Sequence, residues 1–167
     1  RSAMSLVAAN REIYRLLKES IPVSVPDPKG GGQKTERVRV IDWENPPAND
    51  FLLVSQFSVT GSLYTRRPDL VGFVNGLPLV VIELKKPGVP AQQAFDDNLT
   101  CYKADIPQLF WFNGLMIASD GTESHVGSLT ADWERFFEWK RIEREDEPRR
   151  VSLEVMLRGT CEPSRLL

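Results

Sequence analysis

The stretch Arg66–Lys85, RRPDLVGFVNGLPLVVIELK, contains two apolar runs separated by a short polar turn. Leu70–Val74 and Leu79–Leu84 have the length of strands, and Asn75-Gly76 between them is typical of a tight hairpin turn. Both runs are apolar at nearly every position, which indicates central strands covered on both faces. The sequence therefore predicts a buried β-hairpin at the centre of the fold.

The segments on either side of this hairpin predict an α/β domain, with a mixed β-sheet flanked by helices. We expect residues 1–167 to form a single domain. The predicted elements are a helix over Met4–Glu19, a flexible loop over Pro26–Gly32, strands over Val38–Trp43 and Phe51–Val59, a helix over Pro90–Lys103, a strand over Leu115–Ser119, an aromatic helix from Asp132 through Trp139, a solvated charge run over Glu143–Arg150 and a last helix over Ser152–Arg158.

The composition is that of an ordinary soluble domain, with 41% hydrophobic and 26% charged residues among 167. No apolar run approaches the ~20 residues of a membrane helix, so we expect no membrane partner. The net charge of −2 is unlike that of a free-standing DNA binder. Any affinity for DNA must then come from a local basic patch or from missing parts. Two cysteines without metal-type spacing fit a reduced, cytoplasmic protein.

Three charged residues lie at the ends of the hairpin strands. Asp69 begins the first strand, and Glu83 and Lys85 end the second, where strand alternation turns them to the same face. Two carboxylates suit a hard cation such as Mg²⁺, and a neighbouring ammonium can orient water or stabilise charge on a phosphate. The pattern favours phosphodiester hydrolysis, although a Glu and a Lys two positions apart more often mark a solvated strand end.

The register of the hairpin decides whether this site can form. A two-residue Asn75-Gly76 turn pairs Val74 with Leu77, so paired residue numbers sum to 151, and Asp69 then points away from Glu83. A sum of 150 or 152 puts both carboxylates on one face. Periodicity cannot choose between these registers, but a shared cation requires convergence. We therefore predict an even sum, or a bulge or bend near Pro68 or Pro78 with the same effect.

The motif from Arg66 to Lys85 resembles the nuclease motif of the R subunits of type I restriction enzymes. The resemblance extends over nearly the whole chain. Its further segments are Val40–Trp43, Asn49–Phe51, Ala104–Phe110, Ser119–Gly121, Arg135-Phe136 with Trp139-Lys140, Leu153–Val155 and Arg158-Gly159.

This resemblance implies a restriction-endonuclease-like fold of the PD-(D/E)xK superfamily and an endonuclease acting on double-stranded DNA without sequence specificity. It implies that Asp69, Glu83 and Lys85 are catalytic. It also implies that Mg²⁺ binds Asp69, Glu83 and the backbone carbonyl of Leu84. The implied parent polypeptide carries ATP-driven motors and works with methylation and specificity subunits. This chain has no phosphate-binding loop motif, so it does not itself contain the motor.

Five residues are candidates for DNA contacts. Arg66, Arg67 and Lys86 flank the proposed site and suit phosphate groups, although a solvated turn explains each nearly as well. The family's Gln-x-x-x-Tyr motif has its match in Asn98 and Tyr102, which share a helix face. The shorter Asn98 replaces the usual glutamine, which puts its contact in question.

Several alternatives stay open at this point. Relatives often carry a further acidic residue on an upstream helix, and this chain is expected to begin after it. The domain is then either an active nuclease or a catalytically idle domain of the same fold that docks DNA or partner subunits. A stand-alone repair or transposition nuclease is a third reading. Elsewhere, His125 is expected to lie in a surface loop rich in Gly and Ser, and the four tryptophans, Trp43, Trp111, Trp133 and Trp139, are expected to lie in the core.

Overall fold

The computed structural model describes residues 4–144 and 146–167. Its centre is a five-stranded mixed sheet in the order β3-β6-β7-β8-β9, in which only the β7–β8 pair is parallel. The strands of this sheet are β3 (Phe51–Ser55), β6 (Leu70–Val74), β7 (Leu77–Leu84), β8 (Leu115–Ser119) and β9 (Ser124–Gly127). The predicted α/β fold with a mixed sheet is confirmed, and the predicted hairpin is the β6–β7 pair near its middle.

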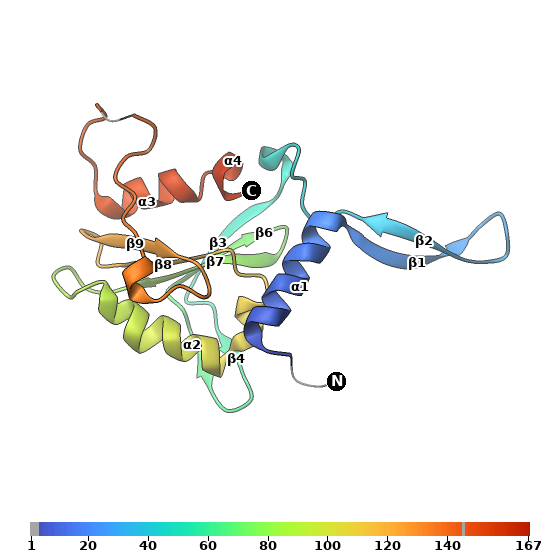
Figure 1. The fold of residues 1–167 in the computed structure, drawn as a ribbon, viewed down its shortest axis with the longest axis horizontal. Helices are drawn as coiled ribbons and strands as arrows, with labels where there is room; N and C mark the ends of the chain where they lie inside the picture. Colours follow the sequence, from blue (N-terminus) through green and yellow to red (C-terminus); the bar gives the residue numbers. More distant parts are fainter. Residues whose placement is uncertain (1–3, 145) are drawn as a thin grey trace.

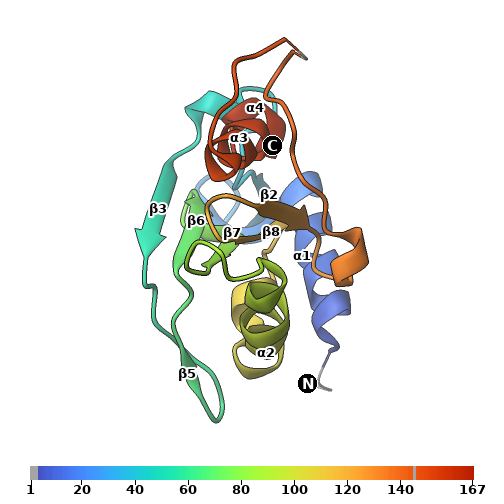
Figure 2. The ribbon, with the colours of Figure 1, turned by 90° about the vertical axis from the view of Figure 1, so that its left-hand side faces the viewer.

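Helices cover both faces of this sheet (Figures 1 and 2). One face packs against α3 (Ser152–Thr160) and α4 (Pro163–Leu166), and the other packs against a helix that begins with one π-helical stretch, Ala94–Leu99, and continues as α2 (Thr100–Asp105). The first helix, α1 (Leu6–Glu19), contributes to both apolar layers. The expected burial of the central hairpin holds for β7, whose residues Leu79 to Glu83 are all buried, while β6 is only partly buried beside the exposed edge strand β3.

The remaining elements lie outside the central sheet. They are β1 (Ile21–Asp27), β2 (Gly32–Val38), β4 (Val59–Thr60), β5 (Thr65–Arg66) and the 3₁₀ turns Pro46–Ala48, Pro107–Phe110 and Trp133–Arg135. None of the described helices is long and apolar enough to cross a membrane.

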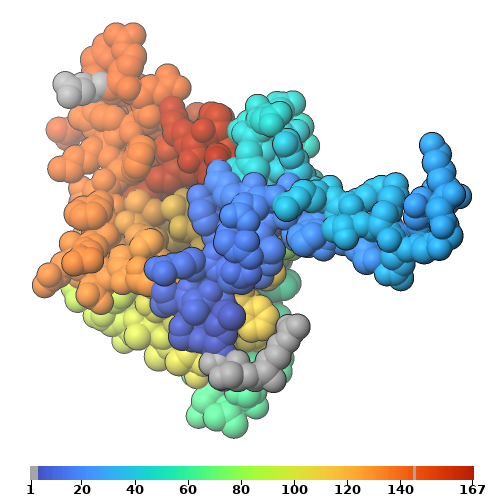
Figure 3. Space-filling model, turned by 45° about the vertical axis from the view of Figure 1, so that its right-hand side comes forward, coloured from blue at the N-terminus to red at the C-terminus, as the bar shows by residue number. Residues whose placement is uncertain are grey.

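The N-terminal region differs from the prediction. The expected loop over Pro26–Gly32 is only the tip of an antiparallel arm formed by β1 and β2, which projects from the body (Figures 1 and 3). Both strands of a two-stranded ribbon are edges, so Pro22 and Pro26 are tolerated there. The strand expected over Val38–Trp43 is wrong. The Asp42 side chain accepts hydrogen bonds from the backbone of Glu44 and Asn45, which turns the chain instead.

The C-terminal half contains a second correction. The aromatic helix expected from Asp132 through Trp139 is limited to one 3₁₀ turn, after which Phe137 pairs with Val126 of β9. The open edge of β9 offers backbone partners that outweigh local helix propensity. His125 therefore lies within a strand rather than in a surface loop. Of the four tryptophans, Trp111 and Trp139 are 42% and 41% exposed, so the expectation that all lie in the core is wrong for these two. The charge run Glu143–Arg150 lies partly outside the described residues.

Candidate active site

A bulge in the central hairpin brings Asp69 and Glu83 together. Near the turn, Val74 pairs with Leu77, but beyond a shift at Gly72/Phe73 the pairing becomes Gly72 with Val80, and Leu70 with Ile82. The register sum changes from 151 to 152, because Leu79, next to Pro78, is the extra residue on β7. This is the even register that a cation shared by the two carboxylates would require, reached through a bulge at one of the two predicted places.

Asp69 is held by two hydrogen bonds to its side chain. Its Oδ2 accepts from the backbone nitrogen of Leu84 at 2.9 Å, and its Oδ1 accepts from Nε2 of Gln56 at 2.7 Å. The backbone nitrogen of Gln56 also donates to the carbonyl of Asp69 at 2.8 Å. Gln56 was missed by the sequence analysis. It follows β3 with a positive φ of 54°, a conformation uncommon outside glycine, and no sequence pattern marks it.

Glu83 is 5% exposed and lies against Asp69 and Tyr102. Its Oε2 accepts a hydrogen bond from the backbone nitrogen of Asp69 at 3.3 Å, and its Oε1 accepts one from the Tyr102 hydroxyl at 3.2 Å. Burial, followed by the negative charge of Asp69, raises the pKa of Glu83 to about 7. The pair therefore forms a local excess of negative charge that a cation would stabilise.

Lys85 joins the same network from the end of β7. Its Nζ donates to Oδ1 of Asn98 at 2.7 Å and lies 3.8 Å from a carboxylate oxygen of Asp97. The amide nitrogen Nδ2 of Asn98 donates to the Tyr102 hydroxyl at 3.2 Å. A continuous chain of contacts thus runs from Lys85 through Asn98 and Tyr102 to Glu83. The shorter Asn98 reaches both neighbours despite replacing the glutamine.

The three basic candidates lie in different settings. Arg66 is bound to Asp105 of α2, with its Nε and Nη2 both 2.7 Å from Oδ2, and it stacks over the Tyr64 ring. Arg67 and Lys86 have exposed side chains and lie two residues before Asp69 and one residue after Lys85 in the sequence. Of these three basic side chains, two therefore face solvent and one is held within the fold.

The oxygen donors present fit a hard divalent cation. The carboxylates of Asp69 and Glu83 converge, one of them is buried, and their mutual repulsion is only partly offset by Lys85. Mg²⁺ is commonly bound through one or two such carboxylates together with water and phosphate. The peptide of Leu84 lies at the same place, since its nitrogen contacts Asp69. The role expected for its carbonyl stays a prediction. The acidic residues of α1, Glu12 and Glu19, both pair with Arg15 instead.

A mixed sheet flanked by helices, with two convergent carboxylates and a lysine at adjacent strand ends, has the architecture of a restriction-endonuclease-like domain. Comparison with known proteins agrees. Residues 1–135 match the family described as "Type I restriction enzyme R protein N terminus", and the chain belongs to this family.

Three relatives illustrate the similarity. The chain is 39% identical over 170 residues to the type I restriction enzyme HindI endonuclease subunit of Haemophilus influenzae, covering 97% of the chain and 16% of that protein. It is 40% identical over 139 residues to a putative type I restriction enzyme MjaIXP endonuclease subunit of Methanocaldococcus jannaschii, covering 80% and 13% respectively. It is 33% identical over 100 residues to the EcoprrI endonuclease subunit of Escherichia coli, covering 58% and 32%. The chain thus spans about a sixth or less of the first two relatives.

Proposed function

We propose that this domain is a Mg²⁺-dependent endonuclease that hydrolyses the phosphodiester backbone of double-stranded DNA. The observation that carries the proposal is the convergence of Asp69 and Glu83, produced by a bulge that a hairpin of uniform register would lack. Lys85 lies beside them through its contact with Asn98. A family name alone would be compatible with an idle domain, whereas a preserved carboxylate pair with an ammonium beside it favours catalysis.

Each residue has a distinct task in this proposal. Asp69 and Glu83, with the backbone carbonyl of Leu84, would hold the ion, which when bound polarises the phosphate and lowers the pKa of a bound water. Lys85 orients the attacking water or stabilises negative charge on the phosphate. These three side chains are the catalytic set.

The surrounding residues position this set and the DNA. Asn98 holds the Lys85 ammonium, and Tyr102 links Asn98 to Glu83. The exposed Arg67 and Lys86 would contact backbone phosphates on either side, which gives affinity without sequence preference. Arg66 would act mainly by fixing its strand to Asp105.

The proposal extends to the protein of which this domain would be part. By analogy with the relatives' names, the domain would cut DNA within a cytoplasmic type I restriction complex. ATP-driven motors elsewhere in the polypeptide, and methylation and specificity subunits, would deliver the DNA. Recognition of a target sequence would then lie outside this domain.

Incubation of the chain with supercoiled plasmid tests the proposal directly. We expect nicking in the presence of Mg²⁺ or Mn²⁺ and none in chelator, and the Asp69→Asn variant at equal concentration is expected to be inactive. Nicking that persists in Asp69→Asn would overturn the assignment. No nicking by the chain or by the full subunit in its complex would favour an idle docking domain.

A further inference from the structure

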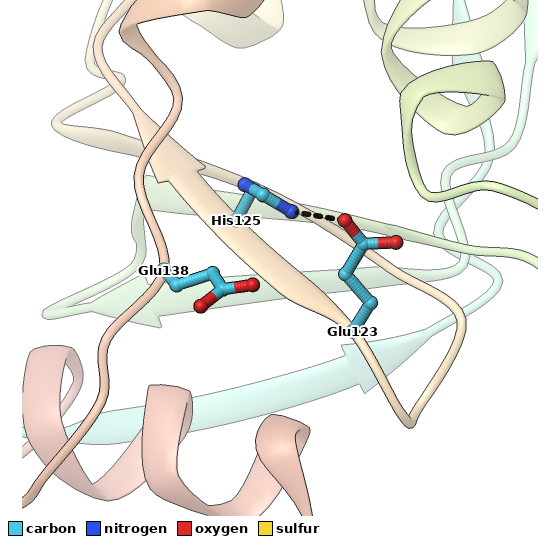
Figure 4. Close-up of side chains that lie close together, drawn as sticks. All are labelled: Glu123, His125 and Glu138. Carbon is cyan, nitrogen blue, oxygen red and sulfur yellow. Dashed lines mark hydrogen bonds and ion pairs between the residues drawn. The ribbon is translucent and has the colours of Figure 1, made fainter.

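A second group of metal-ligating side chains lies outside the candidate active site. Glu123, His125 and Glu138 each offer a ligand atom, and these atoms lie within 4.8 Å of one another. Nε2 of His125 is 2.6 Å from Oε1 of Glu123, and Glu138 extends toward the same space from the neighbouring segment (Figure 4). Neither the proposed cleavage reaction nor its DNA contacts involve these residues.

The backbone explains why these side chains meet. Glu123 immediately precedes β9 and His125 lies two positions later, so the two side chains point to the same face. Val126 and Phe137 exchange two backbone hydrogen bonds of 2.9 and 3.0 Å in an antiparallel bridge. The residues next to this pair, His125 and Glu138, are then directly opposite each other, where side chains approach most closely.

The histidine ring is oriented by a group outside the cluster. Its Nδ1 lies 3.3 Å from the carbonyl oxygen of Phe136, and the ring packs against Trp133 with centroids 4.7 Å apart. With Nδ1 donating to a backbone carbonyl, a metal ion could take the place of the proton that Nε2 shares with Glu123, so that Nε2 presents its lone pair to the ion. This arrangement is the one found around most metal-binding histidines.

The charges in the cluster would suit a bound cation. Within residues 4–144 and 146–167, the Glu138 carboxylate has no hydrogen bond or ion pair, although it faces a second carboxylate across a histidine. Two like charges in one place are unfavourable unless a positive charge joins them. Among the described residues, no lysine or arginine forms an ion pair with Glu123 or Glu138, and the close partner of Glu123 is the His125 ring.

We propose that Glu123, His125 and Glu138 bind a first-row divalent transition-metal ion, with Zn²⁺ as the best match. Imidazole nitrogen together with carboxylate oxygen suits Zn²⁺, whereas Mg²⁺ favours oxygen ligands. Bonds of about 2.0–2.2 Å place ligand atoms roughly 3.4 Å apart, so the present cluster needs only small side-chain movements. Water completes the coordination.

This ion would brace the layer that supports the candidate active site. It would join β9 to the segment containing Trp133 and Phe136, whose rings lie 5.8 and 4.9 Å from the ring of Phe95. Phe95 belongs to the π-helical stretch that also carries Asn98. The site is separate from the first one. Glu83 pairs with Ala118 and Ala118 with His125, so two strand spacings, about 10 Å, lie between Glu83 and His125.

Calorimetric titration with Zn²⁺ tests the proposal in the Asp69→Asn background, which disables the other carboxylate pair and requires no nuclease activity. We expect one Zn²⁺ per chain and a rise in Tm of roughly 2–6 °C at saturation. Glu138→Gln should weaken binding roughly tenfold or more, and so should His125→Ala. Glu134→Gln is the matched control. It makes the same charge change at an exposed position four residues earlier and should bind as the background does.

Two results would overturn the proposal. One is the absence of saturable Zn²⁺ binding in the Asp69→Asn background. The other is binding that Glu138→Gln leaves unchanged relative to Glu134→Gln, since the ion would then lie elsewhere. Because Glu138 is exposed and its carboxylate has no hydrogen-bond partner in the described part of the chain, its substitution tests the site even where His125→Ala fails to fold. Failure of plasmid nicking would not affect either result.

Discussion

The carboxylate oxygen Oε2 of Glu83 lies 3.3 Å from the backbone nitrogen of Asp69, and Oδ2 of Asp69 lies 2.9 Å from the backbone nitrogen of Leu84, which follows Glu83. Each acidic side chain is thus held by the backbone of the other's strand. This reciprocal arrangement requires the two strand ends to be directly opposite. The bulge at Leu79 is therefore the structural feature on which the candidate site depends.

The raised pKa of Glu83 predicts a pH-dependent difference in stability between wild type and Glu83→Gln. Because the folded-state pKa is raised from 4.5 to about 7, the stabilisation from protonated Glu83 is fully present below pH 4.5 and is lost as pH rises through 7. The free energy of unfolding of wild type should then fall relative to Glu83→Gln between pH 5 and 8, by on the order of 2 kcal/mol. Urea titrations in chelator measure this, and parallel pH profiles would refute it.

Gln56 offers a way to separate positioning from folding. Gln56→Gly removes the 2.7 Å bond to Asp69 but also relieves the positive φ of 54°. We expect Tm to stay within a few degrees of wild type, while Mg²⁺-dependent nicking falls about tenfold, the loss expected for one hydrogen bond to a charged group. Unchanged nicking at unchanged Tm would mean that Gln56 does not orient Asp69.

Tyr102→Phe is expected to alter the acidity of Glu83. The Tyr102 hydroxyl donates to Glu83 and so lowers the pKa of that carboxyl, against the larger effect of burial. Loss of the hydroxyl should shift the acidic limb of the pH–rate profile to higher pH and cost about 1 kcal/mol of stability. Tyr14→Phe, at an exposed position on α1, is the control. An unshifted acidic limb would contradict the contact's proposed role.

Arg66 and Arg67 should behave differently toward DNA although they are adjacent. Arg67 is exposed, so Arg67→Ala should reduce the slope of log K against log[salt] by about 0.9, the value for one phosphate contact. Arg66 is bound to Asp105, so Arg66→Ala should mainly lower Tm. Arg39→Ala is the control, because Arg39 is far from Arg67 in the sequence and pairs with Glu44, and it should leave the slope unchanged. Equal slope changes for Arg66→Ala and Arg67→Ala would contradict this division.

The central hairpin could be predicted because its signals are local. Two apolar runs and the Asn75-Gly76 turn specify β6 and β7 without help from the rest of the chain. An even register, or a bulge or bend with the same effect, was predicted from function rather than from periodicity, since β7 is buried on both faces and no polar position indicates the register. The bulge itself lies next to Pro78, a residue that cannot donate to a regular ladder.

The elements that escaped prediction depend on distant partners. Phe137 lies in extended backbone because the edge of β9 is available to it, and nothing near Phe137 in the sequence encodes that edge. Gln56 lies against Asp69 because β3 pairs with β6, thirteen or more residues later in the chain. His125 was expected in a surface loop because Gly and Ser surround it in the sequence, whereas its place in β9 depends on pairing with β8.

The central claim is that Asp69, Glu83 and Lys85 cut DNA while the force-generating machinery lies elsewhere in the parent protein. It is tested most directly in the full restriction complex, by measuring cleavage and ATP-driven translocation on the same DNA for Asp69→Ala, Glu83→Ala and Lys85→Ala. We predict that each variant loses cleavage by at least about 100-fold and keeps translocation near the wild-type rate. Full cleavage in any one variant, or loss of translocation in all three, would contradict the account.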